Sequence, residues 1–403
     1  MSWEFKNLSE ITLLIKRGIA PKYVEQGGLA ILNQKCIRNG VVSYEFSRLC
    51  SSEKKISEDK IIKQGDILVN STGAGTLGRT GFIKEIQNST TVDTHVTIVR
   101  VDKNQIDNKF LASQLLLKEA EIESMGKGAT NQTELSASDL GRLIINLPPL
   151  QTQKRIASIL STYDDLIENN LKRIKLLEET AQNIYKEWFV NFRFPNYENT
   201  PFNEETGLPV GWENTEIKNF ATVVTGKTPS TKNSNYFGGD IPFIKTPDMH
   251  QNIYMDNVEQ YLSLDGAESQ SNKYLPKNTV IISCIGAKAG VVAITSRPSQ
   301  TNQQINAIIP KNLNHNFWLY FSCKELESII HAIGSSGATM TNVSKGKFEN
   351  IKLNLPIDNL VKNYDNIVEC IFEQILILQQ QNQKLKEARD ILLPRLMNRT
   401  IEV

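Results

Sequence analysis

Glycine-rich turns are the segments of this chain whose residue types come closest to a phosphate-binding site. Gly73, Gly75 and Gly78 have the G-x-G-x-x-G spacing of a dinucleotide-binding turn. Such a turn binds a pyrophosphate only where a helix begins directly after it and offers its N-terminus. Residues 79–83 (Arg-Thr-Gly-Phe-Ile) predict a strand instead, so we expect a hairpin loop and no dinucleotide site.

Other catalytic patterns are incomplete as well. Gly226-Lys227-Thr228 resembles the end of a P-loop, but Ala221 stands where the first glycine belongs and Pro229 where the helix would begin. In Asn146-Leu147-Pro148-Pro149, Leu147 and the missing aromatic residue break the Asn-Pro-Pro-aromatic motif of amino-methyltransferases. The histidines have no metal-ligand spacing, and no Ser/His/Asp or Cys/His set is recognisable. The sequence therefore predicts a chain with no catalytic residues, no metal site and no cofactor of its own.

Polar residues that suit DNA bases and phosphates gather in three places in each half of the chain. Arg or Lys can bond guanine, and Asn or Gln can bond adenine, through paired hydrogen bonds in the major groove. Glycine-rich turns let backbone N–H groups approach phosphates. The alternative for any single residue is an ordinary solvated loop. The predicted DNA-binding residues are Asn33, Gln34, Lys35, Arg38, Thr72, Arg79, Thr130 and Gln132 in the first half, and Lys245, Thr246, Asp248, Lys288, Thr339 and Asn342 in the second.

The chain contains an internal repeat of about half its length. Trp3-Glu4 recurs as Trp212-Glu213, and Gly128-Ala129-Thr130 recurs as Gly337-Ala338-Thr339, both with an offset of 209 residues. Gly18 and Gly226 are related by an offset of 208. Because one offset holds across a whole half-chain, we infer a tandem duplication.

Each half begins with short β-branched runs broken by turns and ends in a long stretch without Gly or Pro. In the two long stretches apolar residues alternate three and four apart, the pattern of a coiled-coil seam, and each seam contains one asparagine, Asn170 and Asn382. A buried asparagine in such a seam penalises slipped registers. The predicted fold is α+β: two β-rich domains, each followed by a long helix, with the helices paired as an antiparallel intramolecular coiled coil. The alternative is that each helix packs only on its own domain.

The predicted boundaries follow from these patterns. Pro195, Pro201, Gly207 and Pro209 mark a polar linker, and Pro394 interrupts the second long stretch. The expected segments are a first recognition domain at 1–150, a spacer helix at 151–194, a linker at 195–210, a second recognition domain at 211–356, and a second spacer helix with a C-terminal tail at 357–403.

Composition bounds the function further. The 45 basic and 44 acidic residues leave a net charge of +1, which argues against a protein that coats nucleic acid by charge alone. No stretch approaches the roughly 18 apolar residues of a membrane span. The five scattered cysteines never form C-x-x-C. We expect free thiols and a cytoplasmic location.

The whole sequence resembles the specificity subunit of type I restriction–modification systems. The resemblance rests on Lys22–Gly40, on the Gly-Ala-Thr turn with Leu140–Leu150 after it, on Gln153–Leu160, on Glu187-Trp188-Phe189-Val190 and on Leu392-Leu393-Pro394-Arg395-Leu396. This chain departs from the family pattern at Thr152, where acidic residues are common. Its second half keeps Leu355-Pro356 without the second proline and the following glutamine.

The resemblance implies a non-catalytic DNA-recognition subunit that reads a bipartite, asymmetric target with one domain per half-site. It also implies partners: double-stranded DNA, two methyltransferase subunits that bind S-adenosylmethionine, and two motor–nuclease subunits that use ATP and Mg. Two other classes of function remain open at this point. One is a coiled-coil adaptor without DNA specificity, and the other is an enzyme with an unrecognised active site.

Overall fold

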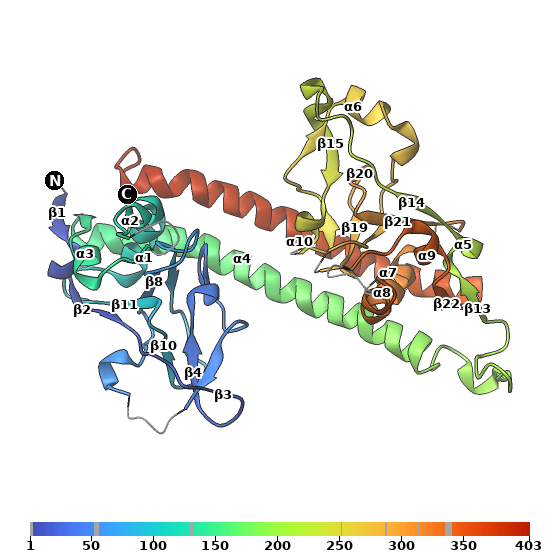
Figure 1. The fold of residues 1–403 in the computed structure, drawn as a ribbon, viewed down its shortest axis with the longest axis horizontal. Coiled ribbons are helices and arrows are strands. Elements are labelled where there is room, and N and C mark those ends of the chain that lie inside the picture. The colour runs from blue at the N-terminus through green and yellow to red at the C-terminus, as the bar shows by residue number, and fades with distance from the viewer. Residues whose placement is uncertain are drawn as a thin grey trace. The chain divides into compact units, whose positions relative to one another are not determined.

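The computed structural model describes residues 3–51, 56–128, 133–250, 252–286, 288–312, 315–334 and 341–403. These residues form two compact units, Met1–Leu166 with Leu385–Val403, and Ile167–Lys384. The long helices α4 and α10 each contribute residues to both units (Figure 1). Each unit therefore contains one end of α4 and one end of α10.

The first unit is built around two sheets. The larger has the order β2 (Thr12–Arg17), β11 (Val96–Val101), β8 (Ile67–Asn70), β9 (Thr80–Phe82), β6 (Gly40–Val42), β5 (Ile37–Arg38). The smaller has the order β10 (Thr90–Val92), β4 (Leu29–Leu32), β7 (Arg48–Cys50), β3 (Tyr23–Val24). β1 (Glu4–Asn7) pairs with β12 (Ile144–Leu147), and the helices are α1 (Asn108–Leu117), α2 (Glu119–Ser124) and α3 (Ala137–Gly141). The short 3-10 turns are η1 (Leu8–Glu10), η2 (Gln34–Cys36) and η3 (Glu58–Lys60).

The second unit repeats this plan. One sheet has the order β14 (Ala221–Thr225), β21 (Ile305–Pro310), β18 (Val280–Ser283), β19 (Val292–Thr295), β16 (Tyr254–Met255). The other has the order β17 (Tyr261–Leu262), β15 (Phe237–Ile244), β20 (Gln300–Thr301), and β13 (Glu213–Glu216) pairs with β22 (Lys352–Leu355). The helices are α5 (Ile217–Phe220), α6 (Leu264–Glu268), α7 (Asn316–Lys324), α8 (Glu327–Gly334) and α9 (Lys345–Glu349). The 3-10 turns are η5 (Tyr197–Asn199), η6 (Ser234–Tyr236), η7 (Thr246–His250) and η8 (Ser271–Lys273).

Strand registers confirm the predicted duplication. Glu4 pairs with Leu147 in the first repeat, and Glu213 pairs with Leu355 in the second. The order β2-β11-β8-β9 has its counterpart in β14-β21-β18-β19. The central strands β8 and β18 are buried at every residue, so their β-branched runs form the middle of each core.

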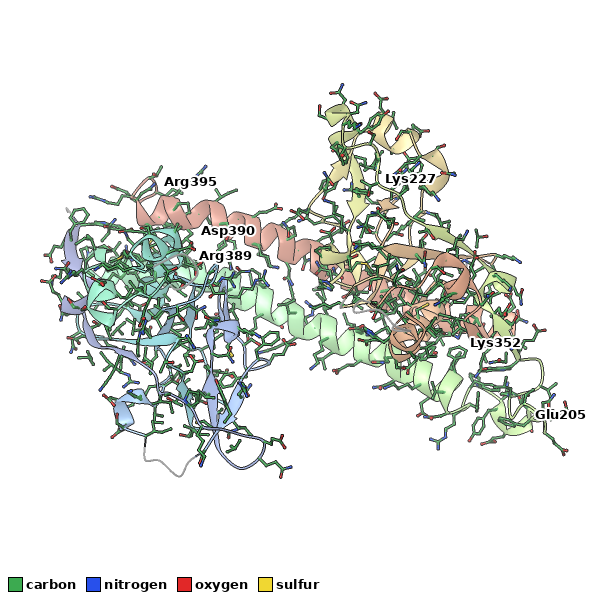
Figure 2. All side chains as sticks on the ribbon, in the orientation of Figure 1. Glu205, Lys227, Lys352, Arg389, Asp390 and Arg395 are labelled. Carbon is green, nitrogen blue, oxygen red and sulfur yellow. The ribbon has the colours of Figure 1, made fainter. Side chains whose placement is uncertain are left out.

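The long helices are α4 (Leu150–Tyr185), which ends in a π-helical turn η4 (Lys186–Val190), and α10 (Asp358–Met397). They run antiparallel, as predicted. In the second unit the Tyr364 hydroxyl donates to the carbonyl of Ala181 at 3.0 Å. In the first unit Arg389, labelled in Figure 2, donates from Nη1 to Oδ1 of Asp164 at 2.7 Å. The predicted α+β fold with paired long helices is confirmed.

The second long helix continues through its proline. Pro394 interrupts the stretch without Gly or Pro but does not end α10, which continues to Met397. Proline removes one backbone donor, a loss of about 3 kcal/mol in a helix interior. Here the last turn places Leu393, Leu396 and Met397 in the core of the first unit, and that burial outweighs the missing hydrogen bond.

The predicted linker is packed against the second unit. Phe194 and Leu208 are buried beside Trp212, and the rings of Phe194 and Trp212 stack with centroids 6.0 Å apart. Polar, proline-rich composition identified the connection but not these aromatic anchors. All five cysteines are free thiols, and only Cys370 is exposed. Among the described residues no helix combines the length and apolar character of a membrane span.

Candidate nucleic-acid interface

Three turns gather at one end of the sheets in each repeat. We name them by order in the chain. Turn A (33–36 and 245–250) follows β4 or β15. Turn B (71–79 in the first repeat, and 283–286 with 288–290 in the second) lies between β8 and β9 or between β18 and β19. Turn C (93–95 and 302–304) joins β10 to β11 or β20 to β21. Two of the three were predicted as polar clusters; turn C was not.

Parallel strand pairs bring turn A and turn C together. In the first repeat Leu32 pairs with Val92, and in the second Ile244 pairs with Thr301. Because both strands of a parallel pair end at the same edge, the turns that follow them are neighbours. The backbone bonds repeat as well: the carbonyl of Leu32 accepts from Asp93 N at 3.0 Å, and that of Ile244 accepts from Asn302 N at 3.1 Å.

In turn A of the first repeat, Asn33 shapes the loop. Its Oδ1 accepts from Lys35 N at 2.8 Å, and its Nδ2 donates to the carbonyl of Phe46 at 2.7 Å. Gln34 reaches turn B, where Thr76 Oγ1 donates to its Oε1 at 3.3 Å. The ammonium group of Lys35 is exposed and makes no ion pair within the described part of the chain. Of these predicted residues, Lys35 and Gln34 are thus the ones positioned to meet a ligand.

In turn A of the second repeat, Asp248 has the shaping role. Its Oδ2 accepts from Lys245 N at 2.8 Å, and its Oδ1 accepts from Glu259 N at 3.0 Å. Thr246 Oγ1 donates to Oε1 of Gln304 in turn C at 3.1 Å. The structure therefore uses Asn33 and Asp248 to hold the two A turns in shape.

Turn B is a hairpin loop in both repeats, as predicted for the first. Gly73 has φ +100° and Gly286 has φ +110°, conformations that favour glycine. Gly78, with φ +86°, would place a Cβ 2.6 Å from the carbonyl oxygen of Glu119. Arg79 Nη2 donates to the carbonyl of Gly75 at 2.6 Å, so this guanidinium closes the loop. The three glycines of the G-x-G-x-x-G pattern serve a tight turn between strands.

The third predicted cluster lies beside turn B where the structure describes it. Ile285 forms a β-bridge with Asn342, and Thr72 forms the equivalent bridge with Glu134. Asn342 is exposed there. Thr130, Gln132 and Thr339 lie outside the described residues.

Arg38 and Lys288 differ in their surroundings. Arg38 is exposed on the edge strand β5, and no hydrogen bond within the described residues joins it to the turns. Lys288 is exposed on turn B. Partial burial and the nearby charge of Lys288 lower the pKa of His250, at the end of turn A. Lys288 is thus an exposed cation of turn B, whereas Arg38 lies on an edge strand outside the three turns.

Turn C contains the residues that sequence reasoning missed. The carbonyl of His95 accepts from Ser71 N at 2.8 Å, and that of Gln304 accepts from Cys284 N at 2.8 Å. Both residues therefore touch turn B. The signal was present in the sequence, because His95 and Gln304 are related by the same offset of 209 residues as the other repeat anchors.

The titratable groups of the site do not suggest covalent chemistry. Burial raises the pKa of the Cys284 thiol to about 12, despite a hydrogen bond from Asn306. Burial also raises the pKa of Cys36. Raised pKa values keep both thiols protonated and poorly nucleophilic. Among the described residues, no group of three or more His, Cys, Asp or Glu side chains could hold a metal ion.

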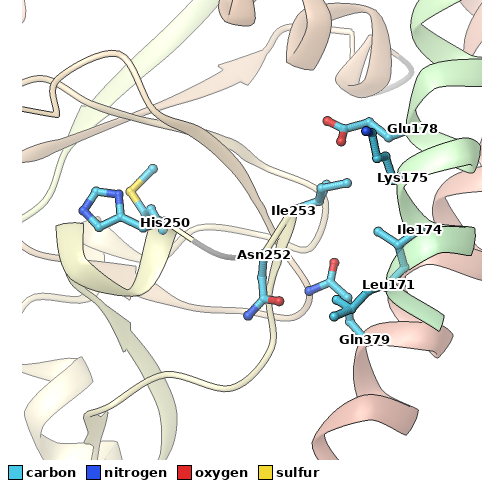
Figure 3. A pocket seen from close by; sticks show the side chains of 9 residues that line it. Leu171, Ile174, Lys175, Glu178, His250, Asn252, Ile253 and Gln379 are labelled. Carbon is cyan, nitrogen blue, oxygen red and sulfur yellow. The ribbon is translucent and has the colours of Figure 1, made fainter. Parts of the chain in front are cut away.

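A hollow of about 260 Å³ in the second unit lies between α4, the segment from the end of turn A to Ile253, and α10 (Figure 3). Two of its polar side chains are engaged by the fold. Glu178 Oε1 accepts from Tyr320 Oη at 2.8 Å and from Lys324 Nζ at 2.6 Å. Gln379 bonds both backbone groups of Tyr254. The hollow is a gap between packed elements, and its described residues do not form a set of functional groups directed at one point.

Comparison with known proteins identifies the family. The model of the type I restriction modification DNA specificity domain matches twice, at residues 2–179 and 209–387. The HindI type I restriction enzyme specificity subunit of Haemophilus influenzae is 30% identical, over 84% of this chain and 87% of its own length. The MjaIX specificity subunit of Methanocaldococcus jannaschii is 22% identical, over 89% of this chain and 84% of its own.

A solved structure has the same fold. The type-I restriction-modification S subunit from M. genitalium aligns with a TM-score of 0.62 and 16% identity, covering 98% of this chain and 96% of that one. The two family matches fall on the two structural repeats, each with its own set of turns A, B and C. The chain belongs to the family of type I restriction modification DNA specificity domains and contains two copies of that domain.

Proposed function

We propose that this chain is the sequence-specific DNA-recognition subunit of a type I restriction–modification complex. Each repeat reads one half of a bipartite target through turns A, B and C, and the paired helices α4 and α10 serve as the spacer. The chain itself is non-catalytic. The methyltransferase partners bring S-adenosylmethionine, and the motor–nuclease partners bring ATP and Mg.

One observation supports this proposal above the others: the two repeats have the same backbone frame and different side chains at the turns. The strand pairings and the bonds that link turns A, B and C recur in both repeats. At equivalent positions the first repeat has Lys35 and Asp93, where the second repeat has Pro247 and Asn302. A constant frame with divergent groups is what two readers of two different half-sites require.

The pseudo-symmetry of the chain supports the proposed partners. A duplicated chain offers two copies of one surface, so two identical methyltransferase subunits can dock on it. The long helices leave apolar side chains exposed, including Leu176 at 62% and Ile391 at 53%. Exposed apolar residues on a helix are suited to a protein partner.

Methylation mapping tests the recognition function. We would express the chain with its methyltransferase partner in a host without other adenine methylation and sequence the modified bases. The expected result is one motif with two short specified parts separated by unspecified bases. A genome with no modified motif would contradict the proposal, provided that the two subunits co-purify.

Assays on the purified chain separate the two other classes of function. An enzyme would bind S-adenosylmethionine or cleave DNA without partners. A coiled-coil adaptor would co-purify with partners but protect no particular DNA sequence in a footprint. We expect no S-adenosylmethionine binding by the chain alone and a sequence-dependent footprint by the complex.

A further inference from the structure

Turn C has the same backbone hydrogen bonds in both repeats and carries His95 in the first repeat and Gln304 in the second. Besides the bonds to turn B, an Asx turn fixes each loop: His95 N donates to Oδ1 of Asp93 at 2.9 Å, and Gln304 N donates to Oδ1 of Asn302 at 3.1 Å. His95 is exposed and Gln304 is half-buried. The backbone is therefore fixed while the side chain differs.

A threonine from a neighbouring turn orients each of these side chains. Thr72 Oγ1 of turn B lies 2.6 Å from Nδ1 of His95. In the second repeat Oε1 of Gln304 accepts from Thr246 Oγ1 at 3.1 Å and from Asn302 Nδ2 at 3.2 Å. With Oε1 occupied twice, the amide group of Gln304 is left to present its Nε2 donor. His95 correspondingly presents Nε2.

We propose that His95 and Gln304 are specificity-determining residues, each contacting a base edge in its own half-site, with Thr72 and Thr246 as positioning residues. This inference rests on the proposed function. The hydrogen bonds offset the entropy cost of ordering these two side chains before a ligand arrives, so little of that cost remains to be met on binding. The Nε2 donor of Gln304 fits an acceptor atom, such as O6 or N7 of guanine or O4 of thymine.

The experiment uses the chain in complex with its methyltransferase partner and a DNA library in which every specified base is randomised. We expect His95→Gln to change the preferred base at a position in one half of the motif by at least about tenfold. Gln304→Glu keeps the acceptor that Thr246 needs but replaces the outward donor by an acceptor. It should therefore shift the other half toward a donor-bearing base, adenine or cytosine. Thr72→Val should weaken the preference in the same half as His95→Gln.

Lys109→Gln is the matched control, since Lys109 is exposed at the start of α1. Asn108, the neighbour of Lys109 in the chain, lies against Gly65, which precedes β8. Turn B follows β8, so Lys109 lies at the opposite end of that strand. If wild type yields no bipartite motif, the proposed function itself has failed. If wild type yields the motif and both His95→Gln and Gln304→Glu keep it unchanged, the assignment of these readers is overturned.

A variant that methylates nothing is judged by a second measurement, the binding of its complex to the motif and to versions changed in one half. Loss of discrimination in one half only supports the assignment of the reader in that half. Unchanged discrimination in both halves overturns it.

Discussion

At the scale of single residues, two glycines allow turn C and the strand before it to approach the end of β2 in the first repeat and of β14 in the second. A Cβ on Gly226 would lie 2.2 Å from the carbonyl oxygen of Asn302, and one on Gly18 would lie 1.9 Å from that of Val92. These are backbone atoms, so no side-chain rotation relieves the clash. The repeat anchor Gly18/Gly226 found in the sequence therefore reflects a close backbone contact behind the proposed readers.

Replacing Gly226 by alanine should destabilise the second unit. We expect a loss of about 1–3 kcal/mol in the free energy of unfolding, because the added methyl group displaces residues 301–302. Urea unfolding of the purified chain, followed by tryptophan fluorescence, measures the effect. Gly346→Ala is the control in the same unit, since nothing lies within 4 Å of its Cβ and it stands in helix α9. Equal midpoints for the two variants would show that the close contact has no energetic weight.

Asp365 is a second residue with a measurable consequence. It lies on α10 and caps the start of α7: Phe317 N donates to its Oδ2 at 3.0 Å and Trp318 N to its Oδ1 at 2.8 Å. Burial nevertheless raises the pKa of this carboxyl to about 7. An aspartate in the unfolded chain has a pKa of about 3.9. Between these values the folded state binds more protons than the unfolded state.

The stabilising contribution of Asp365 is therefore complete below about pH 4 and lost as the pH rises through about 7. We predict that the free energy of unfolding of the wild type falls relative to that of Asp365→Asn between pH 5 and pH 8. Asparagine loses part of the cap at every pH, so only the change with pH is diagnostic. Hydrogen exchange of the α7 amides at both pH values reports it. A constant difference between the two proteins would contradict the raised pKa.

At the scale of elements, the paired asparagines of the long helices are the clearest polar feature of an apolar seam. Asn170 Nδ2 donates to Oδ1 of Asn382 at 2.9 Å, and the side chains are 7% and 4% exposed. Nδ2 of Asn382 is buried with no partner among the described residues. Leucine at both positions would continue the apolar stripe. The pair thus costs stability, and a slipped register would leave each amide against apolar neighbours.

A double-mutant cycle measures how strongly the two asparagine side chains are coupled and how much stability the pair costs. Asn170→Leu or Asn382→Leu alone should cost about 1–3 kcal/mol, because the remaining amide is buried without its partner. The double variant should be at least as stable as the wild type. Thermal and urea unfolding of the four proteins give the coupling free energy. If the single substitutions were as harmless as the double one, the hydrogen bond would not couple the two helices.

Sequence periodicity predicted these elements well, and its failures have physical causes. The coiled-coil seam, the repeat and the hairpin at Gly73 could be predicted because each follows from the spacing and type of residues along the chain. The burial of Leu396 in the core of the first unit could not be predicted, because it depends on contacts with residues far away in the sequence. Turn C was missed because the offset shared by His95 and Gln304 points to a site only once β10 and β4 are known to be neighbours.

At the scale of the whole molecule, the near-neutral charge has a definite consequence for DNA binding. Residues 1–145 contain 19 basic and 17 acidic side chains, and residues 211–350 contain 12 and 11. Nonspecific affinity depends on the number of phosphates neutralised. Two nearly balanced domains neutralise few, so we propose that the methyltransferase partners supply most of the contact with the DNA backbone.

Salt dependence tests this division of labour. Lys35 and Lys288 are the exposed lysines on the described residues of turns A and B. We therefore expect the chain alone to bind duplex DNA weakly, with a plot of log K against log salt of slope about −4 or shallower, and the complex with its methyltransferase partner to show a steeper slope. Within the complex, Lys35→Gln should reduce the steepness by about 0.9 with little change in preferred sequence, because a phosphate contact carries charge without base identity. Lys109→Gln should leave the slope unchanged. A chain that alone reproduces the slope and affinity of the complex would place the backbone contacts on this subunit.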